Sequence, residues 1–189
     1  MKNPCLILAS ASPRRKELLS LMGLELELCP VDVDERLSGA PDAVVMQLAQ
    51  HKARAAAAMC PGQPVLGADT LVACEGETLG KPKDGQDALR MLRLLSGRCN
   101  TVYTGVCVIA PDGTEDVRCE ASLVRFVRID DDSALRYIRS GEPMDKAGAY
   151  GVQGMGGMFV KSVEGSPSNV IGLPMHLVRD MLIRIGFEL

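Results

Sequence analysis

The stretch that decides the fold is TVYTGVCVIAPDGTEDVRCEASLVRFVRI, residues 101–129. Two long runs suited to β-strands, 101–110 and 115–129, flank Pro111-Asp112-Gly113. Proline, aspartate and glycine in this order favour a tight turn between strands. The pattern therefore predicts a hairpin of two long strands at the centre of a sheet.

Shorter strands and amphipathic helices surround this hairpin. Because they intermix without strict alternation, we expect an α/β fold with a mixed central β-sheet flanked by helices, and not a doubly wound parallel sheet. With 189 residues, 47% of them hydrophobic, the chain can bury one sizeable core, so a single domain over residues 1–189 is expected. The apolar spacing predicts strands at 5–9, 24–31, 65–73 and 158–163 and helices at 42–59, 130–140 and 174–185, with two further helices that begin near Ser12 and Asp84.

Composition argues against several partners. The net charge of −3, the lack of a basic run and the absence of Trp disfavour a nucleic-acid-binding surface. The longest apolar stretches are too short to span a bilayer, and the first residues lead into a strand, not into a signal peptide. We therefore expect a cytoplasmic protein with no membrane or nucleic-acid partner.

The seven cysteines predict neither a disulfide framework nor a zinc site. Their number is odd, no two have C-x-x-C spacing, and the chain has only two histidines. We expect mostly reduced thiols in the core. Any metal should then be a hard divalent cation held by oxygen ligands.

The first candidate for chemistry is the segment Ser10-Ala11-Ser12-Pro13-Arg14-Arg15, where a strand ends and a helix begins. Helix N–H groups, hydroxyls and guanidinium groups would together suit a polyphosphate. The alternative is a helix capped by Ser12, with Pro13 at the first helical position and solvated arginines. The segment alone does not decide between these interpretations.

The second candidate is Asp69, a charged residue within the apolar run 64–72. Burial of a lone carboxylate is costly, so such a residue usually has a cation, a metal or strong donors beside it. The alternative is an aspartate that accepts hydrogen bonds from backbone amides at a bulge. We favour the functional interpretation.

Three further features carry little information alone. Lys52 and Lys81 would ordinarily be surface lysines. The acidic loop 32–35 contains Asp34 and Glu35, which could bind a metal but are by default a solvated charge cluster. The segment 145–154 is rich in glycine, which permits close approach of a ligand or an ordinary connection.

Taken together and in order, these motifs resemble the Maf proteins, a family named for septum formation and similar in fold to inosine triphosphate pyrophosphatase. The resemblance covers nearly the whole chain. It rests on the motifs LASASPRR (8–15), GADT (67–70), LGKP (79–82), LSG (95–97), DKAGAYGVQ (145–153) and GLP (172–174).

The resemblance implies a nucleoside triphosphate pyrophosphatase that releases a nucleoside monophosphate and pyrophosphate. It implies that Asp69 is the acidic catalytic residue, described as a proton acceptor, and that Arg14, Lys52 and Lys81 bind the triphosphate. The sequence does not decide whether Asp69 takes the proton itself or mainly positions the metal. A divalent cation, Mg²⁺ or Mn²⁺, would be held by Asp69 with Asp34 or Glu35. A homodimer and a link to cell division are further expectations.

The resemblance also implies that Arg14, Thr70 and Gln153 help to set base preference, and Ser10 is expected to contribute to substrate binding. The segment 145–153 resembles the subgroup that hydrolyses dTTP and UTP. The alternatives are a pyrophosphatase of the 7-methyl-GTP type and a non-catalytic nucleotide-binding regulator of septum formation. The chain departs from the family pattern in two places, which concern the shape of the pocket. Asn100 stands in place of a histidine, and Ser166-Pro167 replaces a more aromatic pair.

Overall fold

A computed structural model describes residues 4–189 of the protein. Within these residues, seven strands form a sheet in the order β2-β1-β3-β5-β6-β7, with β4 paired to β3 beside this path. β1 is parallel to β2 and β3, whereas β3 with β4 and β6 with β7 are antiparallel. The mixed sheet expected from the sequence is therefore confirmed. The strands are β1 (Leu6–Leu8), β2 (Leu26–Leu28), β3 (Val65–Cys74), β4 (Glu77–Leu79), β5 (Cys99–Ile109), β6 (Glu115–Phe126) and β7 (Val160–Glu164).

The chain divides into two compact units. The first contains the described residues up to Asp69, Thr104–Glu120 and Gly172–Leu189, and the second contains Thr70–Tyr103 and Ala121–Ile171. β3, β5 and β6 each contribute one part to each unit. The expectation of one domain over residues 1–189 stays a prediction.

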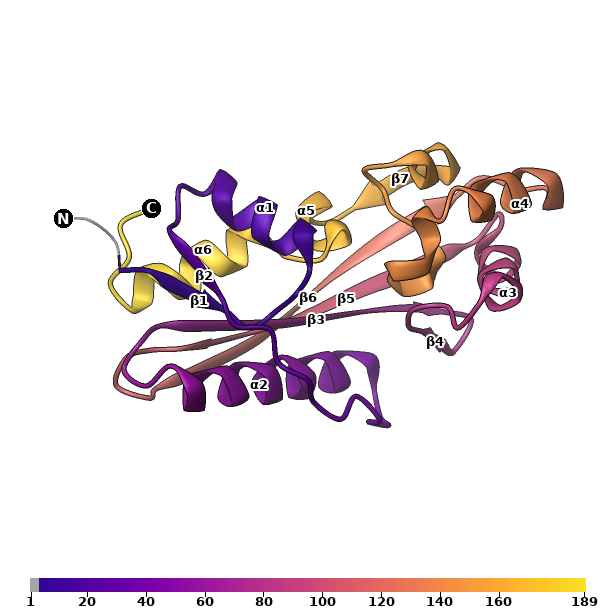
Figure 1. Ribbon diagram of the computed structural model, residues 1–189. Coiled ribbons are helices and arrows are strands. Elements are labelled where there is room, and N and C mark those ends of the chain that lie inside the picture. Colours follow the sequence, from indigo (N-terminus) through magenta and orange to yellow (C-terminus); the bar gives the residue numbers. More distant parts are fainter. Residues whose placement is uncertain (1–3) are drawn as a thin grey trace. The chain divides into compact units, whose positions relative to one another are not determined.

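In the first unit, helices cover both faces of the strands. Figure 1 shows α2 (Pro41–Met59) on one face, and α1 (Pro13–Leu21) and α6 (Met175–Arg184) on the other. The core between α2 and the strands consists of small and β-branched side chains, which allow close packing. They include Ile7, Ala49, Ala53, Ala56, Val65, Cys107 and Ile109.

The second unit has its own apolar core. Its helix α3 (Gly85–Leu95) packs against α4 (Asp131–Arg139). Asp84 and Asp130 cap these helices, because each side chain accepts a hydrogen bond from the backbone N–H three residues later. The remaining elements are short: η1 (Glu142–Asp145), η2 (Ala147–Ala149), η3 (Met155–Phe159) and α5 (Pro167–Ile171).

One expectation about the sheet was wrong, and another is confirmed only in part. The strand expected at 24–31 is limited to Leu26–Leu28, because β2 is an edge strand whose partner β1 is only three residues long. The central strands are β3 and β5. The other strand of the hairpin, β6, lies next to the edge strand β7. The parallel strands β1 and β2 extend the sheet on the side of β3 and shift its centre.

The cysteines are distributed between the core and its margin. Cys29, Cys74 and Cys107 are buried, and the other four are half-buried. Burial raises the pKa of the Cys107 thiol to about 12. No helix within residues 4–189 has both the length and the apolar character needed to cross a membrane.

Candidate functional site

The centre of the candidate site is an ammonium group between two carboxylates. Nζ of Lys52, on α2, donates hydrogen bonds to Oδ1 of Asp69 and to Oε1 of Glu35, both at 2.6 Å. The side chains of Lys52 and Asp69 are only 12% and 13% exposed. Asp69 therefore has the cation beside it that a carboxylate within an apolar strand is expected to need. Lys52 is not an ordinary surface lysine.

A glycine allows α2 to reach Asp69. A Cβ atom at Gly67 would lie 2.4 Å from O of Ala49 and 2.7 Å from N of Ala53, so the helix backbone lies directly on β3 at this point. Positions 67 and 69 share a face of the strand, and Lys52 lies on the helical turn between Ala49 and Ala53. The GADT motif thus places its aspartate against the lysine.

Of the two residues in the acidic loop that were expected to bind a metal, only Glu35 contacts Lys52 beside Asp69. Glu35 contacts Lys52, whereas Asp34 accepts hydrogen bonds from Nε and Nη2 of Arg36 at 2.9 and 3.0 Å. The side-chain hydrogen bond from Arg36 lowers the pKa of Asp34. The structure therefore gives different partners to two residues that the sequence treated as a pair.

The turn between β1 and α1 is organised by Ser10. Its Oγ accepts hydrogen bonds from N of Ser12 at 3.2 Å and from Nη1 of Arg15 at 3.1 Å. Ser12 occupies the N-cap position as expected, but its side chain forms no capping hydrogen bond in the described structure. Ser10 therefore organises the start of the helix in place of Ser12.

Arg15 is a component of the site that the family resemblance did not single out. Its Nε donates a hydrogen bond to O of Gly172 at 3.0 Å, which ties the turn to the GLP motif. Burial lowers the pKa of Arg15, while the nearby charges of Asp69 and Glu35 raise it and that of Arg14 lowers it. Both arginines and both carboxylates therefore belong to one electrostatic neighbourhood. The sequence signal for Arg15 was its place in the segment 10–15, where a strand ends and a helix begins.

The second unit contains Thr70, Lys81 and Gln153. Thr70 is half-buried on β3, and the side chains of Lys81 and Gln153 are exposed. N of Gly148 donates a hydrogen bond to O of Gly80 at 3.0 Å, so the glycine-rich segment is attached beside Lys81. A Cβ atom at Gly148, where φ is +71°, would lie 3.0 Å from Val72, so the segment also packs on β3.

Asn100, which stands where the family pattern has a histidine, lies in the core of this unit. Asn100 is 2% exposed, and its Oδ1 accepts a hydrogen bond from the hydroxyl of Tyr150 at 3.1 Å. Its Nδ2 donates to O of Val124 at 3.2 Å. The Tyr150 ring meets Phe126 edge to face with centroids 4.8 Å apart. Asn100 thus contacts the segment 145–153 through its hydrogen bond with Tyr150.

Ser166, part of the second departure from the family pattern, caps the short helix α5. Its Oγ accepts a hydrogen bond from N of Asn169 at 3.3 Å. Nδ2 of Asn169 donates to O of Val102 and to Oγ of Ser122, both at 3.0 Å. This departure therefore forms part of the local structure that holds Asn169.

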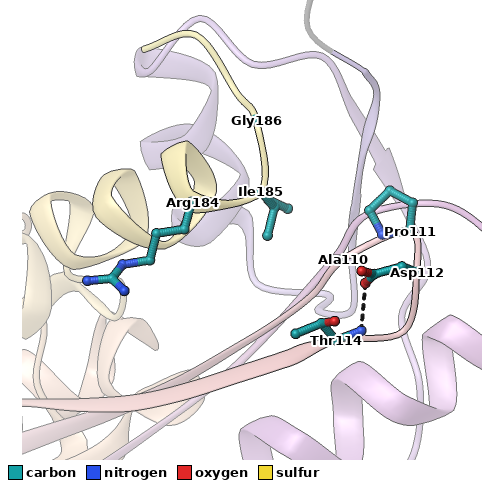
Figure 2. A pocket seen from close by; sticks show the side chains of 7 residues that line it. All are labelled: Ala110, Pro111, Asp112, Thr114, Arg184, Ile185 and Gly186. Carbon is teal, nitrogen blue, oxygen red and sulfur yellow. Dashed lines mark hydrogen bonds between the residues drawn. The ribbon is translucent and has the colours of Figure 1, made fainter.

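A hollow of about 530 Å³ lies in the first unit, beside the turn of the hairpin (Figure 2). In this turn Oδ1 of Asp112 accepts a hydrogen bond from N of Thr114 at 2.8 Å. The lining contains none of the site residues expected from the sequence, so we assign it no role. It consists of Ala110, Pro111, Asp112, Thr114, Arg184, Ile185 and Gly186.

Comparison with known proteins identifies the class. The sequence model of the family described as Maf-like protein matches residues 5–185, and the chain belongs to this family. The structure of a HAM1 protein from Coxiella burnetii has a TM-score of 0.52 and 15% identity, covering 96% of this chain and 100% of that chain. This likeness shows the fold alone. The expected family and fold are therefore confirmed.

Curated relatives within the family carry a common name. The dTTP/UTP pyrophosphatase of Anaeromyxobacter dehalogenans is 50% identical over 191 residues, which cover 98% of this chain and 96% of that protein. The dTTP/UTP pyrophosphatase of Thermococcus gammatolerans is 46% identical over 183 residues, 97% of each chain. The names of these relatives agree with the activity that the sequence predicts.

Proposed function

We propose that the protein hydrolyses dTTP and UTP to the nucleoside monophosphate and pyrophosphate. Two relatives at 46% and 50% identity over nearly the full chain bear the name of this activity. The structural observation that carries the proposal is the Lys52 side chain, only 12% exposed, between Asp69 and Glu35. A cation held beside a carboxylate in this way suits reaction at a phosphate group.

The proposed reaction is attack of water on the α-phosphorus. The bond from this phosphorus to the bridging oxygen breaks, and pyrophosphate leaves with the electron pair of that bond. The proton of the attacking water passes to the carboxylate of Asp69. The ammonium of Lys52, 2.6 Å from Oδ1, orients this carboxylate.

The phosphates need positive charge, because phosphoryl transfer places charge on the transferred group and on the leaving group. Arg14, Arg15 and Lys52 supply it in the first unit. Ser10 orients the guanidinium of Arg15 through their hydrogen bond. The family resemblance adds Lys81 of the second unit to this set.

We propose that Asp69 and Glu35, which hold the Lys52 ammonium through Oδ1 and Oε1, bind a divalent cation, Mg²⁺ or Mn²⁺, through their second carboxylate oxygens. Carboxylate oxygens are the ligands that these ions prefer, and Mg²⁺ is commonly held by one or two carboxylates plus substrate phosphates. Within residues 4–189 no three acidic, histidine or cysteine side chains gather as a metal site, so nucleotide and water would complete the coordination. When bound, the cation would offset phosphate charge. Asp34 could join only by leaving Arg36.

Selection of the base is assigned to Gln153, with Thr70 as a further contributor from the family resemblance. The Gln153 amide offers a donor and an acceptor in one plane, which matches the adjacent carbonyl and N–H of uracil and thymine. Cytosine presents a different pattern. A site built on such paired hydrogen bonds discriminates strongly, because the wrong base leaves polar groups unpaired.

A nucleotide panel tests the proposal. Pyrophosphate release from dTTP, UTP, CTP, GTP and 7-methyl-GTP is measured with Mg²⁺, with Mn²⁺ and after chelation. We expect pyrophosphate release to be fastest from dTTP and UTP. Chelation should abolish activity until the metal is restored. A lead by 7-methyl-GTP would indicate the other subgroup, and tight binding without pyrophosphate release would indicate a regulator. The homodimer, the cytoplasmic location and the link to cell division stay predictions.

A further inference from the structure

The carboxylate of Glu142, a half-buried residue in the second unit, accepts three hydrogen bonds. Its Oε1 accepts from the hydroxyl of Tyr137 at 2.9 Å and from N of Gly156 at 3.2 Å. Its Oε2 accepts from N of Met155 at 2.8 Å. One side chain at the start of η1 therefore satisfies two backbone amides at the start of η3.

The preceding part of the loop is fixed by the same group of residues. N of Gly151 donates a hydrogen bond to the hydroxyl of Tyr137 at 3.2 Å. Tyr137 is fully buried and meets Phe159 edge to face with centroids 5.5 Å apart. Tyr137 therefore links Gly151 to the Glu142 carboxylate, and its own position is fixed by packing.

Glycines allow the loop to approach these side chains closely. A Cβ atom at Gly154 would lie 2.5 Å from both carboxylate oxygens of Glu142. A Cβ atom at Gly156 would lie 2.6 Å from the hydroxyl of Tyr137. The glycine-rich composition of the loop thus has a specific cause, which is contact with a buried tyrosine and a glutamate.

Gln153 lies between the two attachment points. The backbone is held at Gly151 and again at Met155, so Gln153 is two residues from either anchor. Its side chain is exposed, although the backbone on both sides is bound. A short span between fixed points has few conformations, so less order must be gained when the side chain binds a ligand.

We propose that Glu142 is a positioning residue for base specificity, which holds the loop so that Gln153 presents its amide to uracil or thymine. The inference rests on the proposed function, in which Gln153 reads the base. It adds a specificity-determining residue that does not itself touch the nucleotide. Tyr137 supports Glu142 in this role.

The charge of Glu142 suits an anchor. Burial opposes ionisation, but hydrogen bonds from Met155, Gly156 and Tyr137, together with the nearby charge of Lys146, outweigh it and lower the pKa of Glu142. An ionised carboxylate only accepts hydrogen bonds, which matches the three donors around it. An amide at this position would turn an N–H group toward at least one of those donors.

The test compares Glu142→Gln with a matched variant, Glu115→Gln, in the first unit. Glu115 also accepts three hydrogen bonds, from Nε2 of Gln50 and from Nε and Nη2 of Arg54, at 2.6 to 2.9 Å. We expect Glu142→Gln to lower the ratio of kcat/KM for UTP over CTP by about tenfold. Glu115→Gln should leave this ratio unchanged even where it lowers the Tm.

A double variant separates positioning from a general structural effect. Gln153→Ala removes the reading group, so adding Glu142→Gln to it should leave the UTP to CTP ratio unchanged. An equal fall in both backgrounds would overturn the inference. If Glu142→Gln does not fold, Tyr137→Phe decides, because it keeps the ring and the carboxylate and is expected to lower the same ratio.

The two proposals fail differently. A wild-type protein without preference for dTTP and UTP would refute the proposed function. A wild-type protein with this preference, combined with an unchanged ratio in folded Glu142→Gln, would refute the positioning role alone.

Discussion

Asp69 in the first unit and Glu142 in the second are both carboxylates with close hydrogen-bond donors, but the donors differ in kind. Asp69 faces the side-chain ammonium of Lys52, whereas Glu142 faces two backbone amides and a buried phenol. A side-chain ammonium can also bind a phosphate, while backbone amides define the path of the chain. This difference in donors agrees with the two proposed roles, in which Asp69 takes part in the chemistry and Glu142 positions a loop.

The largest effect is expected at the first carboxylate. Asp69→Asn should lower kcat for UTP by about a thousandfold, because the amide keeps the shape but does not accept the proton. The fold should persist, since Lys52 keeps Glu35 as a partner. Steady-state kinetics and thermal unfolding measure the two effects.

The matched control for this variant is Asp116→Asn, which removes a carboxylate paired with Arg118 elsewhere in the first unit. Its kcat should stay within about twofold of wild type, as is usual for a partly exposed ion pair. Near-normal turnover by folded Asp69→Asn would show that Asp69 is not the proton acceptor.

A second difference between the regions lies in what their glycines contact. Gly67 meets the backbone of α2, whereas Gly154 meets the end of the Glu142 side chain. Gly67→Ala should therefore lower the free energy of unfolding by about 3 kcal/mol, and Gly154→Ala by about 1 kcal/mol, because a side-chain end yields more easily than backbone. Urea unfolding of both variants checks the order. A larger loss for Gly154→Ala would contradict this account of the close contact at Gly67.

Much of the first region could be predicted from the sequence. Asp69 is conspicuous because it interrupts an apolar strand, and the irregular mixture of strands and helices around the hairpin indicates a mixed sheet. The contact of Lys52 with Asp69 could not be read from spacing, because it depends on how α2 lies on β3 at Gly67. The divergence of Asp34 and Glu35 was equally hidden, since it depends on which cation each side chain reaches.

The second region was less predictable. Glu142 stands between Gly141 and Pro143 in what resembles an exposed turn, and no feature of its neighbours indicates a bound carboxylate. Its donors come from residues five to fourteen positions away, through an irregular loop. Loops without a regular period carry no pattern from which such contacts can be inferred.

The smallest expected effect concerns pH and stability. The pKa of Glu142 is lowered in the folded protein, so its contribution is fully present above the ordinary glutamate pKa of about 4.3 and is lost as the pH falls through the lower folded value. At neutral pH the free energy of unfolding of wild type should exceed that of Glu142→Gln by about 1 kcal/mol, and this difference should shrink in acid. Urea unfolding at several pH values measures it. A difference that grows on acidification would show that the carboxylate is not the stabilising form.

The most direct test of the central claim, attack of water at the α-phosphorus, traces the oxygen atom of the attacking water into the products. UTP is hydrolysed in water enriched in the heavy isotope of oxygen, and the products are separated and weighed by mass spectrometry. Attack at the α-phosphorus predicts one heavy oxygen in the nucleoside monophosphate and none in pyrophosphate. Heavy oxygen in pyrophosphate, or release of nucleoside diphosphate and orthophosphate, would contradict the account.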